Sequence, residues 1–188
     1  TEGVIDEAIR HAITKMSHLH FTSTDEYKNR VIQLGEQPQR VFNVGALGIE
    51  NINRIKLLSK LEFEKSIKFN LAELNFLVTF HPVTLEKETA GDQLRNLLLA
   101  LNFFPEAKII FTKANADNDG RIINDILEDY VKKNPLNTVL FDSLGQIRYL
   151  SAIRHCQVVI GNSSSGLIEV PSFKKPTINI GDRQKGRI

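Results

Sequence analysis

The feature that most constrains the fold is a regular alternation of short apolar segments and longer amphipathic ones between residues 75 and 181. The apolar segments have the length of strands and the amphipathic ones have helical spacing. The predicted strands are 75–82, 107–112, 137–141, 156–161 and 176–181, and the predicted helices are 86–103, 119–133, 144–154 and 164–173. Strands that alternate with helices in this way form a parallel sheet with helices on both faces, the doubly wound α/β class.

The residues before 75 give a less regular pattern. Two helices are predicted, the first opening at Thr1 and the second capped by Thr24, with short strands at 19–22 and 40–45. One or two helices follow over 50–69. The chain opens within a helical pattern and stops soon after a strand, so we expect it to be an internal part of a longer polypeptide.

Composition excludes several classes of partner. The 24 basic and 22 acidic residues are well mixed and give a net charge of +2, without the long basic block typical of a nucleic-acid surface. No apolar run reaches the ~18 residues of a membrane span. The single cysteine, Cys156, allows no intrachain disulfide and fits a reducing compartment. We therefore expect a cytoplasmic globular protein with no nucleic-acid or membrane partner.

Polar and charged residues follow each predicted strand. They are His81, the segment 113–121, Asp142-Ser143, the segment 162–166 and the segment 181–187. Because the carboxyl ends of parallel strands meet at one edge of the sheet, where ligands bind in this class, we expect the chemistry to gather there.

The segment 161–166, "GNSSSG", suits an anion. Small residues between a strand and a helix let the backbone approach a phosphate, and Ser163 and Ser164 can add hydroxyl donors. Alternatively, these serines only cap the helix. Glu169 can accept two hydrogen bonds from a ribose diol or can face solvent, and His81 can contact a diphosphate, move a proton or be structural.

Two further segments carry charged residues that could bind an ion. "NADNDGR" (115–121) contains Asn115, Asp117 and Arg121, but Ile126 stands where a calcium loop needs a bidentate Glu, so we reject a calcium site. Arg183 in the segment 181–187 can neutralise a phosphate or can belong to a solvated loop.

Four motifs together carry a resemblance to a known family. "TEGVIDEAIRHAITKMSHLHF", "FHPVTLE", "NADNDGR" and "GNSSSGLIEVPSFKKPTINIGDRQKGR" resemble the hydrolysing UDP-N-acetylglucosamine 2-epimerases of bacterial sialic and legionaminic acid pathways. The resemblance implies the GT-B architecture of two Rossmann-like domains. Residues 1–47 would end the N-terminal domain, and residues 48–188 would be most of the nucleotide-binding C-terminal domain, without its final part.

The resemblance also implies a reaction and a site. A UDP-2-acetamido sugar loses UDP by elimination across C1–C2, and water addition then releases a free sugar of the N-acetylmannosamine type. Glu7 and His81 would be catalytic, with a second acid upstream of Thr1. The implied substrate-binding residues are His81, Ser163 and Ser164 on the diphosphate, Glu169 on the ribose, Phe141 on uracil through its backbone, and Asn115, Asp117, Arg121 and Arg183 along the cleft.

Several choices stay open at this stage. The substrate can be a diacetamido sugar nucleotide instead, and a GT-B glycosyltransferase that uses a UDP-sugar donor shares the same binding logic. The resemblance implies no metal and no redox cofactor. We expect the complete enzyme to be a homo-oligomer, either a dimer or a tetramer, and the 188-residue chain alone to be inactive.

Overall fold

The computed structural model describes residues 5–82, 90–115 and 120–186. The chain divides into two compact units, the first comprising Thr1–Arg54 together with Lys185–Ile188 and the second comprising Ile55–Gln184. The domain boundary expected between residues 47 and 48 stays a prediction. Within the described ranges, no helix combines the length and the apolar character needed to cross a bilayer.

The first unit contains a small parallel sheet with helices. Its elements are α1 (Ile5–Met16), β1 (His20–Thr22), α2 (Asp25–Gln33), the 3₁₀ turn η1 (Pro38–Arg40), β2 (Val41–Asn43) and α3 (Leu47–Arg54). β1 pairs in parallel with β2, and Phe21 stacks on Phe42 with 5.7 Å between ring centroids. The predicted cap of α2 is confirmed, because the backbone N–H of Tyr27 donates to the Thr24 hydroxyl at 3.1 Å.

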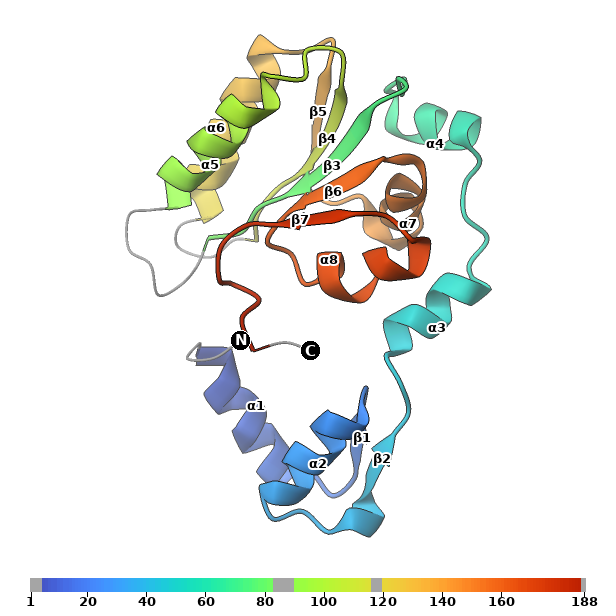
Figure 1. Cartoon of the computed structure of the whole chain (residues 1–188), viewed down its shortest axis with the longest axis vertical. Helices are drawn as coiled ribbons and strands as arrows, with labels where there is room; N and C mark the ends of the chain where they lie inside the picture. The colour runs from blue at the N-terminus through green and yellow to red at the C-terminus, as the bar shows by residue number, and fades with distance from the viewer. Residues whose placement is uncertain (1–4, 83–89, 116–119, 187–188) are drawn as a thin grey trace. The chain divides into compact units, whose positions relative to one another are not determined.

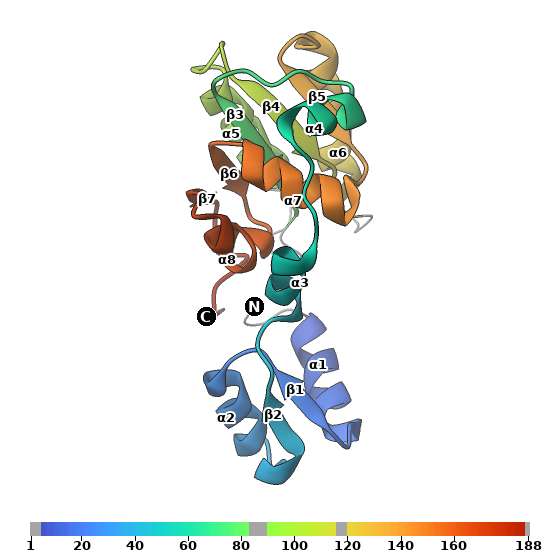
Figure 2. The same cartoon turned by 90° about the vertical axis from the view of Figure 1, so that its right-hand side faces the viewer.

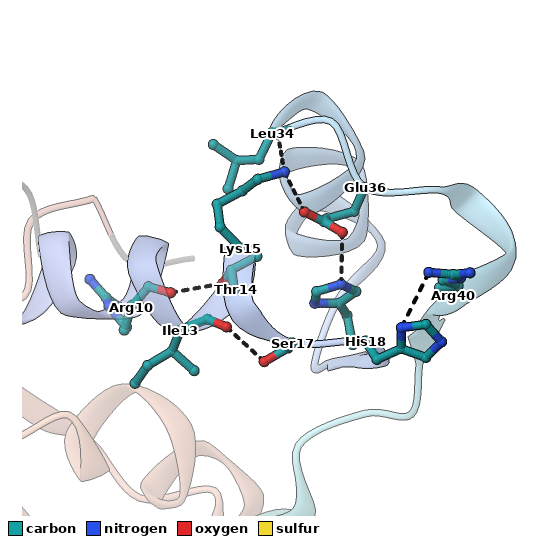
Figure 3. A network of polar contacts seen from close by, with 10 residues as sticks. Arg10, Ile13, Thr14, Lys15, Ser17, His18, Leu34, Glu36 and Arg40 are labelled. Carbon is teal, nitrogen blue, oxygen red and sulfur yellow. Dashed lines mark hydrogen bonds and ion pairs between the residues drawn. The ribbon is translucent and has the colours of Figure 1, made fainter.

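A polar network joins α1 to the segment that follows α2 (Figure 3). Lys15 of α1 donates to the Leu34 carbonyl at 3.2 Å and pairs with Glu36 at 2.6 Å. His20 of β1 lies 3.1 Å from the other oxygen of Glu36. The hydrogen bond from Lys15 lowers the pKa of Glu36, with a further contribution from His20. Glu36 thus links α1 and β1 to the segment that follows α2.

The second unit is the predicted doubly wound domain (Figures 1 and 2). Its sheet has the order β5-β4-β3-β6-β7, with every pairing parallel. The strands are β3 (Asn75–Thr79), β4 (Lys108–Thr112), β5 (Thr138–Phe141), β6 (Val158–Gly161) and β7 (Thr177–Asn179). The helices are α4 (Lys60–Ile67), α5 (Ala90–Leu101), α6 (Gly120–Lys133), α7 (Gly145–His155) and α8 (Ser165–Ile168). Figures 1 and 2 show α5 and α6 on one face of the sheet and α7 and α8 on the other, as the alternation predicts.

The strand order fixes where a ligand can bind. From β3 the chain steps through β4 to β5, and it then returns to place β6 beside β3 on the opposite side. The order reverses between β3 and β6, and a crevice opens outside the carboxyl ends of the two strands at such a point. The residues that follow β3 and β6 are therefore the first to consider as a site.

The core of this unit is apolar and continuous. All five residues of β3 are buried, as expected of a central parallel strand covered on both faces. Leu94 and Leu98 of α5 and Ile123 and Leu127 of α6 pack in the same cluster, at the helical spacing of four residues. Burial of each such side chain stabilises the fold by about 1.5–3 kcal/mol, so this layer holds the sheet edge rigidly.

One predicted element is wrong in its extent. The helix expected over 164–173 is only one turn of α-helix, α8, followed by the 3₁₀ turn η2 (Val170–Phe173). Pro171 is the cause, because it has no N–H to donate and its ring collides with the carbonyl four residues earlier in an α-helix. Glu169 consequently lies at the junction between α8 and η2 rather than inside a continuous helix.

Candidate nucleotide site

Asn162 joins the two strands at the point where the sheet order reverses. The backbone N–H of His81 donates to the Asn162 Oδ1 at 2.7 Å, and the Asn162 Nδ2 donates to the His81 carbonyl at 2.7 Å. Asn162 is only 1% exposed. Its side chain therefore continues the β3–β6 pairing past the last residue of each strand and fixes the backbone of His81 relative to the serines that follow β6.

The approach of β6 to β3 requires glycine at position 161. Gly161 has φ of +139°, and a Cβ there would lie 1.8 Å from the Thr79 carbonyl oxygen. A side chain is excluded by both conformation and space. The Thr79 hydroxyl in turn lies 2.6 Å from the Thr112 hydroxyl of β4, so the ends of three neighbouring strands are held together.

The segment after β7 returns to the same place. The Arg183 guanidinium donates to the Asn162 carbonyl at 3.1 Å, and the Gln184 side chain donates to the same oxygen at 2.7 Å. Arg183 is half-buried, and Gln184 is 4% exposed. A cationic group is thereby positioned beside the residues that follow β6.

A pocket of about 370 Å³ opens at this edge, over the ends of β3, β4 and β5 and the start of α7. Its lining includes Thr79, His81, Lys113, Asn115, Asp142 and Tyr149. This volume is within the range of small-molecule sites. The pocket lining combines residues at strand ends, a side-chain amide, the Lys113 ammonium and the Asp142 carboxylate. These groups suit a polar ligand of moderate size.

Tyr149 connects the pocket to the residues around α8. Burial raises the pKa of its hydroxyl, the Glu169 carboxylate raises it further, and the hydroxyls of Ser165, Thr79 and Ser163 act in the opposite direction. Among the described residues, the buried Tyr149 hydroxyl, Ser165 hydroxyl and Glu169 Oε2 lack a well-formed hydrogen bond. Buried polar atoms without a partner are uncommon in folded proteins, and here they gather next to a pocket.

A lysine between two carboxylates forms one wall of the pocket. The Lys113 Nζ lies 2.7 Å from Asp142 and 2.9 Å from Glu128 of α6. The hydrogen bonds that Lys113 donates to Asp142, and next to Glu128, raise the pKa of Lys113 to about 12. The side chain of Asp142 is 85% exposed, and that of Lys113 is 25% exposed. Lys113 is therefore charged at neutral pH, and the Asp142 carboxylate remains accessible.

Several sequence-predicted residues meet at this edge. His81 and Asn115 line the pocket, Ser163 and Glu169 adjoin Tyr149, and Arg183 contacts Asn162. Ser164 immediately precedes α8. Their roles in binding stay predictions.

The other predicted residues are placed differently. Glu7 is in α1 of the first unit, and Asp117 lies outside the described residues. Arg121 is exposed in the first turn of α6 and is not among the described residues that line the pocket. Phe141 ends β5, and its carbonyl accepts a hydrogen bond from the Lys113 N–H at 2.9 Å.

Three contributors to the site, Asn162, Lys113 and Tyr149, are not among the individual site residues predicted from the sequence. Asn162 follows a strand at the reversal point, and that position was an available signal. Lys113 also follows a strand, but its pairing with Asp142 and Glu128 depends on three separate segments. Tyr149 gave no signal, because an aromatic residue at helical spacing within 144–154 is typical of a core position.

The family model of UDP-N-acetylglucosamine 2-epimerase matches residues 1–188. The chain belongs to this family. Among curated relatives, it is 48% identical over 188 residues to the GDP/UDP-N,N'-diacetylbacillosamine 2-epimerase (hydrolyzing) of Campylobacter jejuni, covering 100% of this chain and 49% of that protein. It is 49% identical over 185 residues to the polysialic acid biosynthesis protein P7 of Escherichia coli, covering 97% and 46%. The chain thus spans about half the length of the curated relatives it matches.

Solved structures agree on the fold. The UDP-GlcNAc 2-epimerase of Neisseria meningitidis bound to UDP-GlcNAc matches with a TM-score of 0.72 at 18% identity, over 95% of this chain and 48% of that one. The S. aureus MnaA–UDP structure matches with a TM-score of 0.68 at 13% identity, over 92% and 44%. The predicted fold class, an α/β chain of GT-B type with a Rossmann-like domain, is confirmed.

Proposed function

We propose that the complete protein is a hydrolysing 2-epimerase that converts a UDP-linked 2-acetamido sugar into a free, C2-inverted sugar and UDP. The observation that carries the proposal is the meeting of His81, Asn162 and Ser163 where the sheet order reverses, beside a pocket and a buried carboxylate oxygen without a partner. Membership of the epimerase family and the names of the relatives support it.

The proposed binding mode follows the polar groups along the sheet edge. The diphosphate lies at Ser163, Ser164 and His81, with Arg183 compensating its charge. The ribose hydroxyls donate to Glu169, which gives the buried Oε2 a partner and relieves the cost of desolvating it. The nucleobase lies in the pocket, beyond Tyr149 and near the backbone of Phe141. Asn115, Asp117 and Arg121 belong to the cleft in this proposal.

The proposed reaction has two steps. A base takes the C2 proton while the C1–O bond to UDP breaks, giving a 2-acetamidoglucal and UDP. Water then adds, with a proton to the opposite face of C2 and hydroxyl to C1. Glu7 is the proposed carboxylate for proton transfer, and His81 assists at the leaving diphosphate. No cofactor or metal enters the proposal.

The sugar and the pathway are the finer part of the proposal. Relatives from C. jejuni and Legionella pneumophila are named for N,N'-diacetylbacillosamine, and one from N. meningitidis is named for N-acetylglucosamine. At 48% identity to the first and 28% to the last, we favour the diacetamido sugar nucleotide. We place the enzyme in nonulosonic acid biosynthesis in the cytoplasm, as a homo-oligomer.

The product separates this proposal from a glycosyltransferase. The complete protein is incubated with UDP-N,N'-diacetylbacillosamine and, separately, UDP-N-acetylglucosamine, with no acceptor sugar present. Release of UDP together with a free 2-epimerised sugar supports the epimerase. Release of UDP only after an acceptor is added supports the transferase instead. A Glu169→Gln variant, which should bind UDP more weakly, shows whether the reaction uses this site.

A further inference from the structure

We propose that Tyr149 is a positioning residue whose hydroxyl accepts a hydrogen bond from Ser165 and donates one to Glu169, and so holds the carboxylate in place for the ribose. The inference rests on the proposed function for the place of the ribose. It adds a residue that acts on the ligand only through Glu169, and it makes the preference for ribose over deoxyribose depend on that residue.

Ser165 and Glu169 lie on one face of the single turn of α8. They are four residues apart, and the Glu169 N–H donates to the Ser165 carbonyl at 3.0 Å. The Glu169 carbonyl in turn accepts from the Ser172 N–H of η2 at 3.1 Å. The backbone of Glu169 is therefore held on both sides, and the direction of its carboxylate depends on the side-chain torsions and on the groups that contact it.

Tyr149 belongs to α7, which lies on the same face of the sheet as α8 and packs against η2 (Figure 2). The four residues that follow it in α7, 150–153, are buried, so the helix is firmly seated. The Tyr149 side chain lines the pocket, but its hydroxyl oxygen is buried. A ligand in the pocket therefore meets the ring, and the hydroxyl is left to act on the protein groups behind it.

Three buried atoms of this cluster complement one another as donors and acceptors. Among the residues that the structure describes, the hydroxyls of Tyr149 and Ser165 and the Glu169 Oε2 lack a well-formed hydrogen bond. The pKa of Tyr149 shows that the three groups are close, because burial raises it, the Ser165 hydroxyl lowers it and the Glu169 charge raises it. A hydroxyl can donate and accept, whereas an ionised carboxylate only accepts. A chain from Ser165 through Tyr149 to Glu169 gives each of the three atoms a partner.

The order of this chain follows from the acidity of the two hydroxyls. A phenol is a stronger acid than a serine hydroxyl and is therefore the better donor to a carboxylate, and such charge-assisted hydrogen bonds are short and strong. A donor that approaches the phenolic oxygen lowers the pKa of a tyrosine, and Ser165 acts in that direction here. Tyr149 is thus the group that donates to Glu169, and Ser165 supports Tyr149.

The chain prepares Glu169 for a ribose. A carboxylate has about four lone-pair sites on its two oxygens, so a hydrogen bond from Tyr149 to Oε2 leaves sites for both hydroxyls of the ribose diol. The bond also fixes the rotation of the carboxylate before the ligand arrives, and a group that is already ordered loses less entropy on binding. This gain applies to a nucleotide with both hydroxyls and is smaller for one that lacks the 2′-hydroxyl.

The test is a comparison of UDP with 2′-deoxy-UDP in the complete protein, measured by calorimetry. The wild type should bind UDP more tightly, because both ribose hydroxyls reach Glu169. Tyr149→Phe removes only the phenolic hydroxyl, and UDP affinity should fall by about tenfold, the scale of losing one hydrogen bond to a charged group. The affinity for 2′-deoxy-UDP should fall less, so that the preference for UDP shrinks. Ser165→Ala should act in the same direction with a smaller effect.

Tyr130→Phe is the matched control. It makes the same chemical change on α6, where the Tyr130 hydroxyl donates to Asn102 at 2.8 Å, and it should leave both affinities unchanged. A double-mutant cycle shows whether Tyr149 acts through Glu169. When Glu169→Gln is already present, adding Tyr149→Phe should change the preference for UDP little further.

Several results would overturn the inference. Equal weakening of UDP and 2′-deoxy-UDP by Tyr149→Phe would mean that the hydroxyl only supports the fold, and unchanged affinities would mean that it has no part in binding. A larger effect of Ser165→Ala than of Tyr149→Phe would reverse the order of the chain. A wild type that binds the two nucleotides equally overturns the inference together with the place of the ribose at Glu169. A wild type that binds no UDP overturns the proposed function itself.

Discussion

The Asn162 side-chain amide binds the backbone of His81 twice, because its Oδ1 accepts from the His81 N–H and its Nδ2 donates to the His81 carbonyl, at 2.7 Å for each hydrogen bond. This pairing joins the ends of β3 and β6 where the order of the sheet reverses. It also brings the segment 161–166 beside the only histidine that follows a sheet strand in the described part of the second unit.

We predict that Asn162→Ala destabilises the fold. The N–H and the carbonyl of His81, both in part-buried hydrogen bonds, would lose Asn162 as a partner, and an unsatisfied buried group costs about 1–3 kcal/mol. Chemical denaturation followed by circular dichroism should show that the free energy of unfolding falls by an amount of this order. Asn179→Ala is the control, since Asn179 makes a single exposed hydrogen bond to Gly181 at 3.1 Å. Equal stability of the two variants would contradict the structural role of Asn162.

A second prediction compares two glycines with positive φ. Gly161→Ala adds about 1–3 kcal/mol of backbone strain and forces a Cβ to within 1.8 Å of the Thr79 carbonyl oxygen. Gly145 has a φ of +64°, and no atom lies within 4 Å of a Cβ placed there. Gly145→Ala should therefore lose only the free energy of holding alanine in the left-handed conformation, about 1–2 kcal/mol. Thermal unfolding should give Gly161→Ala a clearly lower melting temperature than Gly145→Ala. The reverse order of melting temperatures would mean that β6 can move away from β3.

The fold was predictable from the sequence to a large extent because its signals are local. The strands β3 to β7 and the helices between them each carry a periodic pattern, and alternation determines a parallel sheet. The end of the α-helix before Pro171 is also a local signal. The predicted helix over 164–173 was too long because it ran through this proline. The site was less predictable. Lys113, Asp142 and Glu128 are brought together by tertiary structure, and the contact between Asn162 and His81 spans 81 residues of sequence.

A third prediction concerns pH and the first unit. Lys15 lowers the pKa of Glu36 below its ordinary value of 4.5. The stability contributed by this pair is therefore present above pH 4.5 and is lost as pH falls through the lower, folded-state pKa. Lys15→Met should lower the melting temperature at pH 7, and the difference from wild type should shrink in more acidic buffer. Lys28→Met is the control, and a difference that persists undiminished at pH 3 would contradict the prediction.

A fourth prediction concerns Glu7 in the complete protein. Glu7→Gln keeps the size and polarity of the side chain but cannot accept a proton, so turnover should fall by about 10²–10⁴-fold. Affinity for UDP should change little, because the proposed nucleotide contacts are in the second unit. Steady-state kinetics combined with calorimetry separates the two effects. If turnover and UDP affinity fell together, Glu7 would have a structural role instead.

A fifth prediction concerns Ser163 and Glu169. Ser163→Ala and Glu169→Gln should each weaken UDP binding by about 1–3 kcal/mol, the scale of losing a hydrogen bond to a charged or buried partner. Calorimetry measures both. Ser172→Ala, in η2 and outside the proposed contacts, is the control for the serine change. Wild-type affinity in both variants would remove the two residues from the site.

The 188-residue chain alone should not turn over substrate, because the elimination needs groups that we place upstream of Thr1. Correct orientation of both walls around a substrate can account for about 7–11 kcal/mol of the barrier. Purified residues 1–188 incubated with the UDP-sugar should release no UDP above the uncatalysed rate. Turnover at the rate of the complete protein would show that the proposed second acid is not required.

The most direct measurement of the central claim is isotope incorporation at C2 of the sugar. The complete protein is incubated in D₂O with the UDP-2-acetamido sugar, and the released sugar is examined by ¹H NMR. Elimination followed by water addition predicts that each product molecule carries deuterium at C2 and has inverted configuration there, with one UDP released per sugar. A product that retains protium and its original configuration at C2 would contradict the account, because the C1–O bond would then have been broken without removal of the C2 proton.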